Sequence, residues 1–363
     1  MTVLADSGIS AGVMAQGAKV WQDREKLGIV LNTGLELRKK FAVFSLLISL
    51  PVLFYLLHSH GAGLVFTLLI MLSIIPAFYA ALSDNLLEIP LKLHQDISKL
   101  QKNQIATGIG RFFLITLSLF LFPWTFIAIL GNGIPRLLAN IRLRKLSVNY
   151  ADRIQKTDPI IEKEMFSIVK RTLPGALYFC ISGQITIWLI SIFGSTESIA
   201  HIGALGRLTM VLTVFTTLFT TIAVPRFARF PENKRLLINR FFLIQLSLFG
   251  ISSIFICIAF LIPNQLLWIL GNGYKGLTKE IFLITISSCL AMISGITYSV
   301  LIARGWIIKS AIYVPFNLAV QLILVLTMDL SKTTNVLLFS IVDFSIGFLI
   351  LLIYFFYRIL KIG

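Results

Sequence analysis

Long apolar stretches make up most of this chain and restrict the folds open to it. We identify ten of them as complete membrane spans, at about 41–58, 63–82, 104–122, 123–141, 173–193, 200–224, 239–262, 279–302, 309–327 and 335–357. Each has roughly the 17–25 residues with which an α-helix crosses a hydrocarbon core about 30 Å thick. Lipid offers no partner for a free backbone N–H or C=O, and the stretches lack the alternation of barrel strands. The sequence therefore predicts an all-α, polytopic membrane helix bundle.

The composition excludes a water-soluble globule. Apolar residues make up 57% of the 363 residues and charged residues 13%, with a mean hydropathy of +0.88. Soluble domains have about 45–50% apolar and about 25% charged residues, so this chain lacks the polar surface that a globule needs. The net charge of +16 is also typical of nucleic-acid-binding proteins, but the positions of the basic residues indicate membrane orientation instead. No nucleic-acid partner is expected.

The basic residues alternate from loop to loop along the chain. Of the 32 Lys and Arg, 28 fall in one alternating set of loops and tails, whereas Lys275, Lys279 and Lys332 fall in the other set. The remaining one, Arg207, lies inside a span. Because cytoplasmic loops carry the excess of Lys and Arg, we predict a multi-pass protein of the inner (plasma) membrane with a cytoplasmic C-terminus.

The basic stretch 142–172 divides the predicted spans into two groups. We expect an N-terminal lobe over 1–141, a cytoplasmic basic linker helix over 142–172 and a C-terminal lobe of six spans over 173–363. Asp158 and Pro159 predict a helix start inside the linker, as its N-cap and its first helical residue. The two lobes are expected to be pseudo-repeats of each other.

Two segments of the N-terminal lobe carry predictions of their own. Residues 1–18 have the length and composition of a helix end whose beginning is absent, so we expect an incomplete lobe with a partial helix and four spans. In 84–103, apolar residues such as Leu86, Ile89 and Leu93 recur at spacings of three and four. This pattern predicts an amphipathic helix lying on the membrane face, with a solvated connector as the alternative.

Two charged residues inside spans are the first candidates for function. Arg207 lies about 10 Å from the outer end of its span, taking 1.5 Å per residue, and Asp343 lies at a similar depth in the last span. A charge inside the membrane costs roughly 2.5–3.5 kcal/mol on insertion scales and is usually functional or paired. Two interpretations are open: Arg207 faces a central cavity and binds an anionic head group, or it forms a structural ion pair with Asp343.

Three amides inside spans are further candidates: Gln184, Asn317 and Gln321. They either line a cavity and bind sugar hydroxyls, or they join helices by hydrogen bonds. The sequence has no Ser/His/Asp arrangement, no Gly-rich phosphate loop and no His/Cys metal cluster. We therefore expect no enzymatic activity, no metal and no cofactor.

Three stretches resemble the polysaccharide-exporting flippases of the multidrug/oligosaccharidyl-lipid/polysaccharide (MATE-like) exporter superfamily. ADSGISAGVMAQGAKVWQDREKLG (5–28) resembles the end of the second helix and the first cytoplasmic turn of that family. Residues 173–230, ending in Pro-Arg-Phe-Ala-Arg, resemble the seventh and eighth helices, and LLWILGNGYKGL (266–277) resembles the outer turn after the ninth. The resemblance implies a two-lobed bundle with alternating access.

The resemblance also implies a substrate. Such proteins move an undecaprenyl-pyrophosphate-linked oligosaccharide across the bilayer, and Arg207 is the residue of suitable type and depth to contact the pyrophosphate. We expect a monomer. Two other functions stay open: a cation-coupled drug exporter of the same superfamily, and a non-transporting, truncated membrane protein. The exporter would require acidic residues in the front spans, and the complete front spans contain none.

Overall fold

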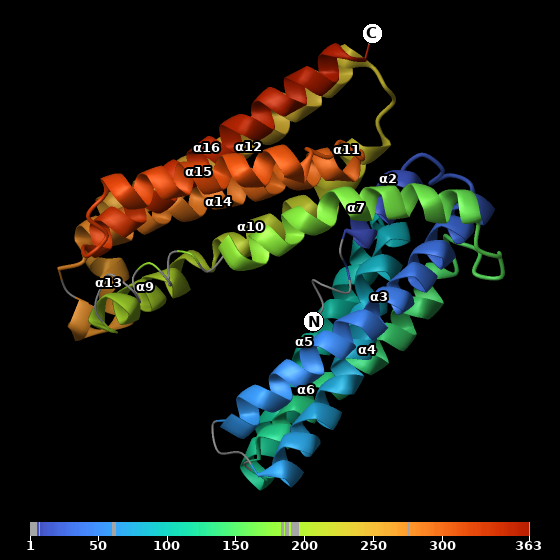
Figure 1. The fold of residues 1–363 in the computed structure, drawn as a ribbon, viewed down its shortest axis with the longest axis horizontal. Helices are drawn as coiled ribbons and strands as arrows, with labels where there is room; N and C mark the ends of the chain where they lie inside the picture. The colour runs from blue at the N-terminus through green and yellow to red at the C-terminus, as the bar shows by residue number, and fades with distance from the viewer. Residues whose placement is uncertain are drawn as a thin grey trace. The chain divides into compact units, whose positions relative to one another are not determined.

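The computed structural model describes residues 6, 8–59, 63–122, 124–182, 185, 189, 196–274 and 276–362. All regular elements in this part of the chain are helices, as predicted (Figure 1). Among the described residues, six helices are long and apolar enough to cross a membrane, or up to seven if a bent pair is one span. They are α4 (Leu64–His94), α5 (Ile97–Leu121), α12 (Lys234–Leu261), α14 (Thr278–Ala303), α15 (Ser310–Thr327) and α16 (Thr333–Leu360). The protein is therefore a multi-pass membrane protein, and the full set of ten spans stays a prediction.

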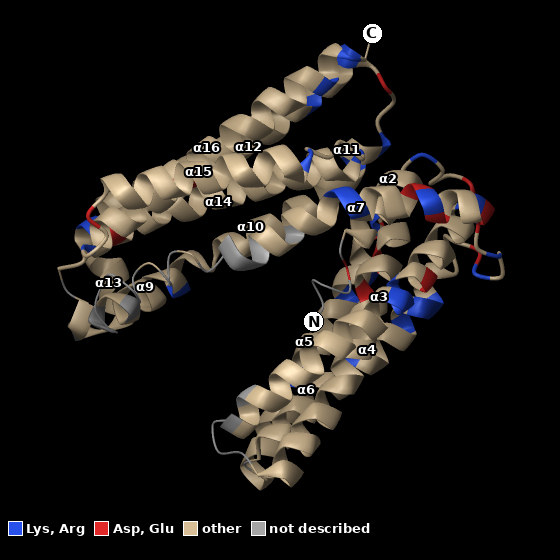
Figure 2. Ribbon diagram, viewed as in Figure 1, with Lys and Arg blue, Asp and Glu red and all other residues tan. Residues whose placement is uncertain are grey.

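The chain divides into two compact units, Met1–Ala176 and Leu177–Gly363. The first unit holds α4 and α5 together with α2 (Ile9–Gly17), α3 (Arg24–Ser59), α6 (Thr125–Ser147) and most of α7 (Pro159–Ser182). Within it, α4 packs against α3 and α6, and α6 also packs against α5 (Figure 1). The charged residues of this unit gather at one end of its helices, around α2 and α3 (Figure 2).

The segment 84–103 is not a separate surface helix. Instead, α4 continues to His94, the chain turns at Gln95 with a φ of 59°, and α5 begins at Ile97. Its apolar stripe, including Leu86 and Leu93, is fully buried within the unit. The prediction was wrong because a stripe at helical spacing looks the same whether it packs on lipid or on a neighbouring helix.

The predicted linker 142–172 consists of the end of α6, a loop and the start of α7. The predicted helix start is confirmed: α7 begins at Pro159, and the carboxylate of Asp158 accepts a hydrogen bond from the backbone N–H of Ile160 at 2.8 Å. This bond satisfies one of the backbone donors that a helix start leaves free.

The loop between α6 and α7 is bound to α3. The side-chain amide of Asn32 donates to the carbonyl oxygens of Arg153 at 3.0 Å and Gln155 at 2.8 Å. Gly28 permits this close approach, because a Cβ at that position would lie 1.9 Å from the carbonyl oxygen of Asp152. The connection out of α6 is thus an integral part of the first unit.

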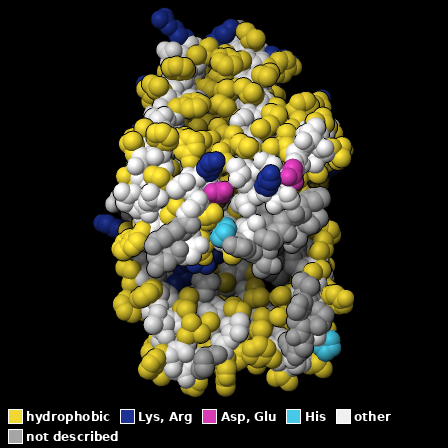
Figure 3. All heavy atoms as spheres, turned by 90° about the vertical axis from the view of Figure 1, so that its left-hand side faces the viewer, with side chains coloured by type: hydrophobic (Ala, Val, Ile, Leu, Met, Phe, Trp, Pro, Cys, Tyr) yellow, Lys and Arg dark blue, Asp and Glu magenta, His cyan; other side chains and the backbone are white. Residues whose placement is uncertain are grey.

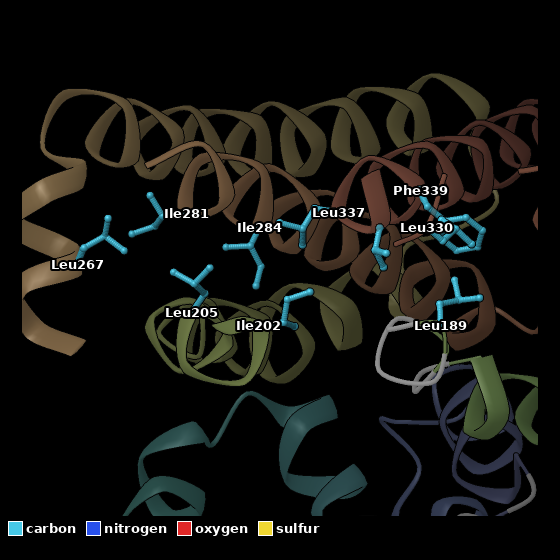
Figure 4. Packing of buried hydrophobic residues seen from close by; sticks show 10 residues of the cluster. Leu189, Ile202, Leu205, Leu267, Ile281, Ile284, Leu330, Leu337 and Phe339 are labelled. Atoms are coloured by element: carbon cyan, nitrogen blue, oxygen red, sulfur yellow. The ribbon is translucent and has the colours of Figure 1, made fainter. Parts of the chain in front are cut away.

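The second unit is built around α14. This helix contacts α12 and α16 and also α9 (Thr196–Thr209), α10 (Leu212–Leu218), α11 (Val224–Arg229) and α13 (Pro263–Leu270). An apolar cluster packs α9 against α14, with Ile202 and Leu205 on one helix and Ile281 and Ile284 on the other (Figure 4). These contacts fix the position of the helix that carries Arg207.

Large apolar side chains also cover the outside of the helices. Phe120 is 87% exposed, and Leu326 and Ile353 are similarly open. Apolar side chains dominate the face shown in Figure 3, with few charges among them. Contact of such a surface with water is unfavourable in free energy, so the hydrocarbon core of a membrane is its expected surrounding.

Candidate functional site

A helix break lies directly after α9. Residues Ala200–Thr209 and Leu212–Arg229 form a bent pair with an angle of 46° between them, and a π-helical turn follows at Phe219–Ala223. Broken helices in transporters present helix ends to substrates and ions. Arg207 lies in the last turn of α9, where the helix dipole favours a cation.

Arg207 is exposed because the opposite side of α9 packs against the rest of the second unit. Leu205, two residues earlier and thus about 200° around the helix, is buried in the apolar cluster of the second unit. The guanidinium of Arg207 forms no hydrogen bond or ion pair with any residue that the structure describes. The charge is therefore available for an anion.

The carboxylate of Asp343 has an amide as its partner. Gln321 of α15 donates its Nε2 to both carboxylate oxygens of Asp343 on α16, at 3.2 and 3.3 Å. Both Asp343 and Arg207 are described residues, and no ion pair joins them. The structure thus does not have the Arg207–Asp343 pair, one of the two interpretations open from the sequence, and within the described part of the chain the acid has no cationic partner.

The two amides of α15 face inward together. Asn317 and Gln321 lie four residues apart, hence on one face of the helix. They are the buried side chains of α15, at 3% and 4% exposure, whereas Leu318 and Leu322 are exposed. The third predicted amide, Gln184, lies outside the described residues. In a membrane this inside-out arrangement of polarity lets α15 contact its neighbours through hydrogen bonds.

A tyrosine that the sequence analysis did not single out belongs to this group. The backbone carbonyl oxygen of Tyr313 accepts a hydrogen bond from the Asn317 side-chain amide at 2.8 Å. The Tyr313 ring contacts the Tyr178 ring edge-on, with 6.5 Å between the ring centroids. We call Tyr313, Asn317, Gln321 and Asp343 the amide–carboxylate cluster. The sequence spacing could have identified Tyr313, because Tyr313, Asn317 and Gln321 follow one another at intervals of four residues and so lie on one face of α15.

A charged network in the first unit was also missed. Arg38, 2% exposed, is paired with the carboxylate of Asp6. Asp84 accepts hydrogen bonds from the amide of Asn140 at 2.6 Å and from Nε of Arg136 at 2.9 Å. Both acids therefore already have cationic partners, in contrast to Asp343.

The sequence itself matches no known protein family and no curated protein. Solved structures are similar over 99% of this chain and 85% of theirs. They include an outward-facing multidrug resistance MATE family transporter of the MOP superfamily, at 16% identity and a TM-score of 0.78. Another is MATE in complex with MaD5, at 15% identity and a TM-score of 0.76. A third is a MOP superfamily transporter from Pyrococcus furiosus, at 17% identity and a TM-score of 0.73, whose binding pocket has reverse polarity, suggesting a different function.

Proposed function

We propose that this chain, which has the fold of the MATE family transporters, moves a lipid-pyrophosphate-linked oligosaccharide across the cytoplasmic membrane by alternating access. The observation that carries the proposal is Arg207, an exposed cation at the break after α9 without a partner among the described residues. A diphosphate is the group that such a cation suits, because guanidinium forms bidentate, charge-assisted hydrogen bonds with phosphate oxygens.

The amide–carboxylate cluster supplies the other parts of the proposed mechanism. Asn317 and Gln321, together with Gln184, would offer hydrogen bonds to sugar hydroxyls, while the lipid tail stays in the bilayer. Asp343 has an amide and no described cation beside it. An ionisable group in that position inside a membrane is a candidate for proton or cation coupling.

A cation-coupled drug exporter is the second candidate function, and Asp343 is the observation that favours it. A carboxylate without a cationic partner attracts a lipophilic cation as well as a proton. One of the similar solved structures is a multidrug resistance transporter. The two functions differ in the sign of the ligand charge, so they can be separated by binding.

Competitive binding to the purified chain in detergent tests the proposal. A short-chain polyprenyl-diphosphate sugar is set against tetraphenylphosphonium, for the parent, Arg207→Gln, Arg207→Lys and Asp343→Asn. The matched control is Arg111→Gln. Arg111 is also an exposed arginine in a candidate span, and among the described residues its side chain donates one long hydrogen bond, to Asn132 at 3.4 Å.

The proposed function predicts that the diphosphate lipid binds and that Arg207→Gln weakens this binding by about 1.5–3 kcal/mol, or about 10- to 150-fold. Arg207→Lys retains part of the affinity, and the Arg111 control retains all of it. Binding of the phosphonium alone, abolished by Asp343→Asn, establishes the exporter instead. Equal losses in Arg207→Gln and Arg111→Gln contradict a specific role for Arg207.

A further inference from the structure

The second unit carries a concentration of basic residues at the helix ends nearest its C-terminus. Figure 2 shows Lys and Arg at the end of α16 and along the chain leading into α12. The segments that hold them, 226–240, 304–309 and 358–361, contain one acidic residue, Glu232. We name eight of these residues the basic rim: Arg226, Lys234, Arg235, Arg240, Arg304, Lys309, Arg358 and Lys361.

Six basic residues of the first unit form ion pairs with acids, whereas no residue of the basic rim is in an ion pair among the described residues. All six ion pairs that the structure gives between described residues lie in the first unit, among them Lys40–Glu162 and Lys92–Glu88, both at 2.7 Å. The positive-inside rule accounts for basic residues on one side of both units. It does not account for a rim whose eight basic residues have one acid, Glu232, in their segments.

Two arginines of the rim are held in place around one tryptophan. The guanidinium carbons of Arg304 and Arg358 lie 5.2 and 5.7 Å from the ring centroid of Trp306, which is buried. Arg304 also donates to the carbonyl oxygens of Phe227 at 3.1 Å and Phe230 at 2.9 Å. The Nε atoms of Arg304 and Arg358 are buried and have no hydrogen-bond partner among the described residues. Glu232 is the one acid whose charge acts on Arg304, so this pair of cations suits an anion from outside the chain.

The start of α12 adds an accessible part to the rim. A surface hollow of about 320 Å³ is lined by Lys234, Arg235, Ile238 and Asn239. Lys234 and Arg235 are both exposed, so substituting them leaves the packing of α12 intact. A hollow with two cations and an apolar wall suits a phosphate group that is attached to a larger, partly apolar molecule.

We propose that the basic rim binds the head groups of anionic phospholipids. The rim lies at the ends of membrane-crossing helices, so the bilayer surface is the nearest source of negative charge. Basic clusters next to membrane helices attract anionic lipids in this way. Exposed apolar side chains such as Leu360 and Phe356, on the last turns of α16, offer a surface for the acyl chains. This site is separate from Arg207 and does not depend on the proposed transport function.

The test is lipid binding to the purified full chain in neutral detergent. Dioctanoyl phosphatidylglycerol is titrated against dioctanoyl phosphatidylcholine, with bound lipid counted by native mass spectrometry and the unfolding midpoint followed in parallel. Sodium phosphate in a third arm separates a lipid head group from a free anion. The variants are Lys234→Gln with Arg235→Gln, and Arg358→Gln. The matched control is Lys26→Gln with Lys40→Gln, which removes the same charge from residues that are paired with Asp23 and Glu162.

We expect phosphatidylglycerol to bind more tightly than phosphatidylcholine and to raise the unfolding midpoint. The double substitution in the rim weakens this binding about 30-fold, whereas the control pair changes it less than about threefold. Equal affinity for the two lipids overturns the proposal. So does an equal loss in both double variants, which would indicate net charge alone, or displacement of the lipid by phosphate at equal concentration.

Discussion

Gln321 on α15 donates its side-chain amide to both carboxylate oxygens of Asp343 on α16, at 3.2 and 3.3 Å. This contact joins the last two membrane helices of the chain through their polar side chains. No described cation pairs with the carboxylate, so the Gln321 amide is its main hydrogen-bond partner among the described residues. The strength of this contact can be measured separately from any transport activity.

The substitution Gln321→Leu is expected to lower the free energy of unfolding in detergent by about 1–3 kcal/mol, because it leaves the carboxylate of Asp343 without its donor. Adding Asp343→Leu should restore most of the loss, since both partners of the bond are then apolar. Leu322→Ala, on the exposed side of α15, serves as the control. Additive losses in the double variant would show that the two residues do not interact.

The pair between Arg38 and Asp6 is expected to matter more for stability than for transport. Arg38 is buried, whereas the Asp6 side chain is 29% exposed and also accepts hydrogen bonds from Ser10. Arg38→Met should therefore cost about 1–3 kcal/mol in unfolding free energy. Combining Arg38→Met with Asp6→Asn should recover much of this cost. Thermal unfolding of the single and double variants measures both effects, and no measurable loss for Arg38→Met would contradict a stabilising pair.

Arg38 also illustrates why part of the structure could not be predicted from the sequence. It stands beside Lys39 and Lys40, and three consecutive basic residues at a span boundary are typical of an exposed cytoplasmic loop. In the structure α3 continues through them, so that Arg38 turns inward while Lys39 and Lys40 stay exposed. Its partner, Asp6, is 32 residues away in the chain, and hydropathy carries no information on such pairings.

Hydropathy did predict the class of fold, and two of the three amides predicted inside spans, Asn317 and Gln321, are buried. Apolar length alone fixes a membrane helix, because lipid leaves the backbone no other solution. Helix ends were less predictable. The hydropathy falls at Asp84, but α4 continues to His94, because apolar residues beyond Asp84, such as Leu86 and Leu93, are buried against other helices of the first unit. The depth of Arg207 in the membrane stays a prediction, whereas the absence of an ion pair with Asp343 could be seen only in the structure.

Gly28 is expected to tolerate no side chain. A Cβ there would overlap the carbonyl oxygen of Asp152, 1.9 Å away, and a backbone atom cannot move aside as a side chain can. Gly28→Ala should therefore displace the loop after α6 and lower the free energy of unfolding by about 1–3 kcal/mol. Gly108→Ala is the control, since a Cβ on that α5 glycine meets nothing within 4 Å. Protease cleavage in the loop is a second measurement, and an uncut, fully stable Gly28→Ala would contradict the close approach.

The turn between α4 and α5 should make stability depend on pH through Asp96. Hydrogen bonds from Lys99 and from the Tyr150 hydroxyl lower the pKa of the Asp96 carboxyl below its usual value. A lowered pKa stabilises the folded state above the unfolded value of about 3.9, and the contribution is lost as the pH falls through the folded value.

Tyr150→Phe removes the hydroxyl but keeps the ring, whose centroid lies 4.7 Å from that of His94. We expect this variant to unfold at a lower temperature than the parent at about pH 6, and the difference to shrink as the pH falls below about 3.9 and through the lowered pKa of the folded Asp96 carboxyl. Tyr55→Phe, on an exposed tyrosine of α3, should show no such dependence. A difference that stays constant over this pH range would mean that the hydroxyl does not act through the ionised carboxylate.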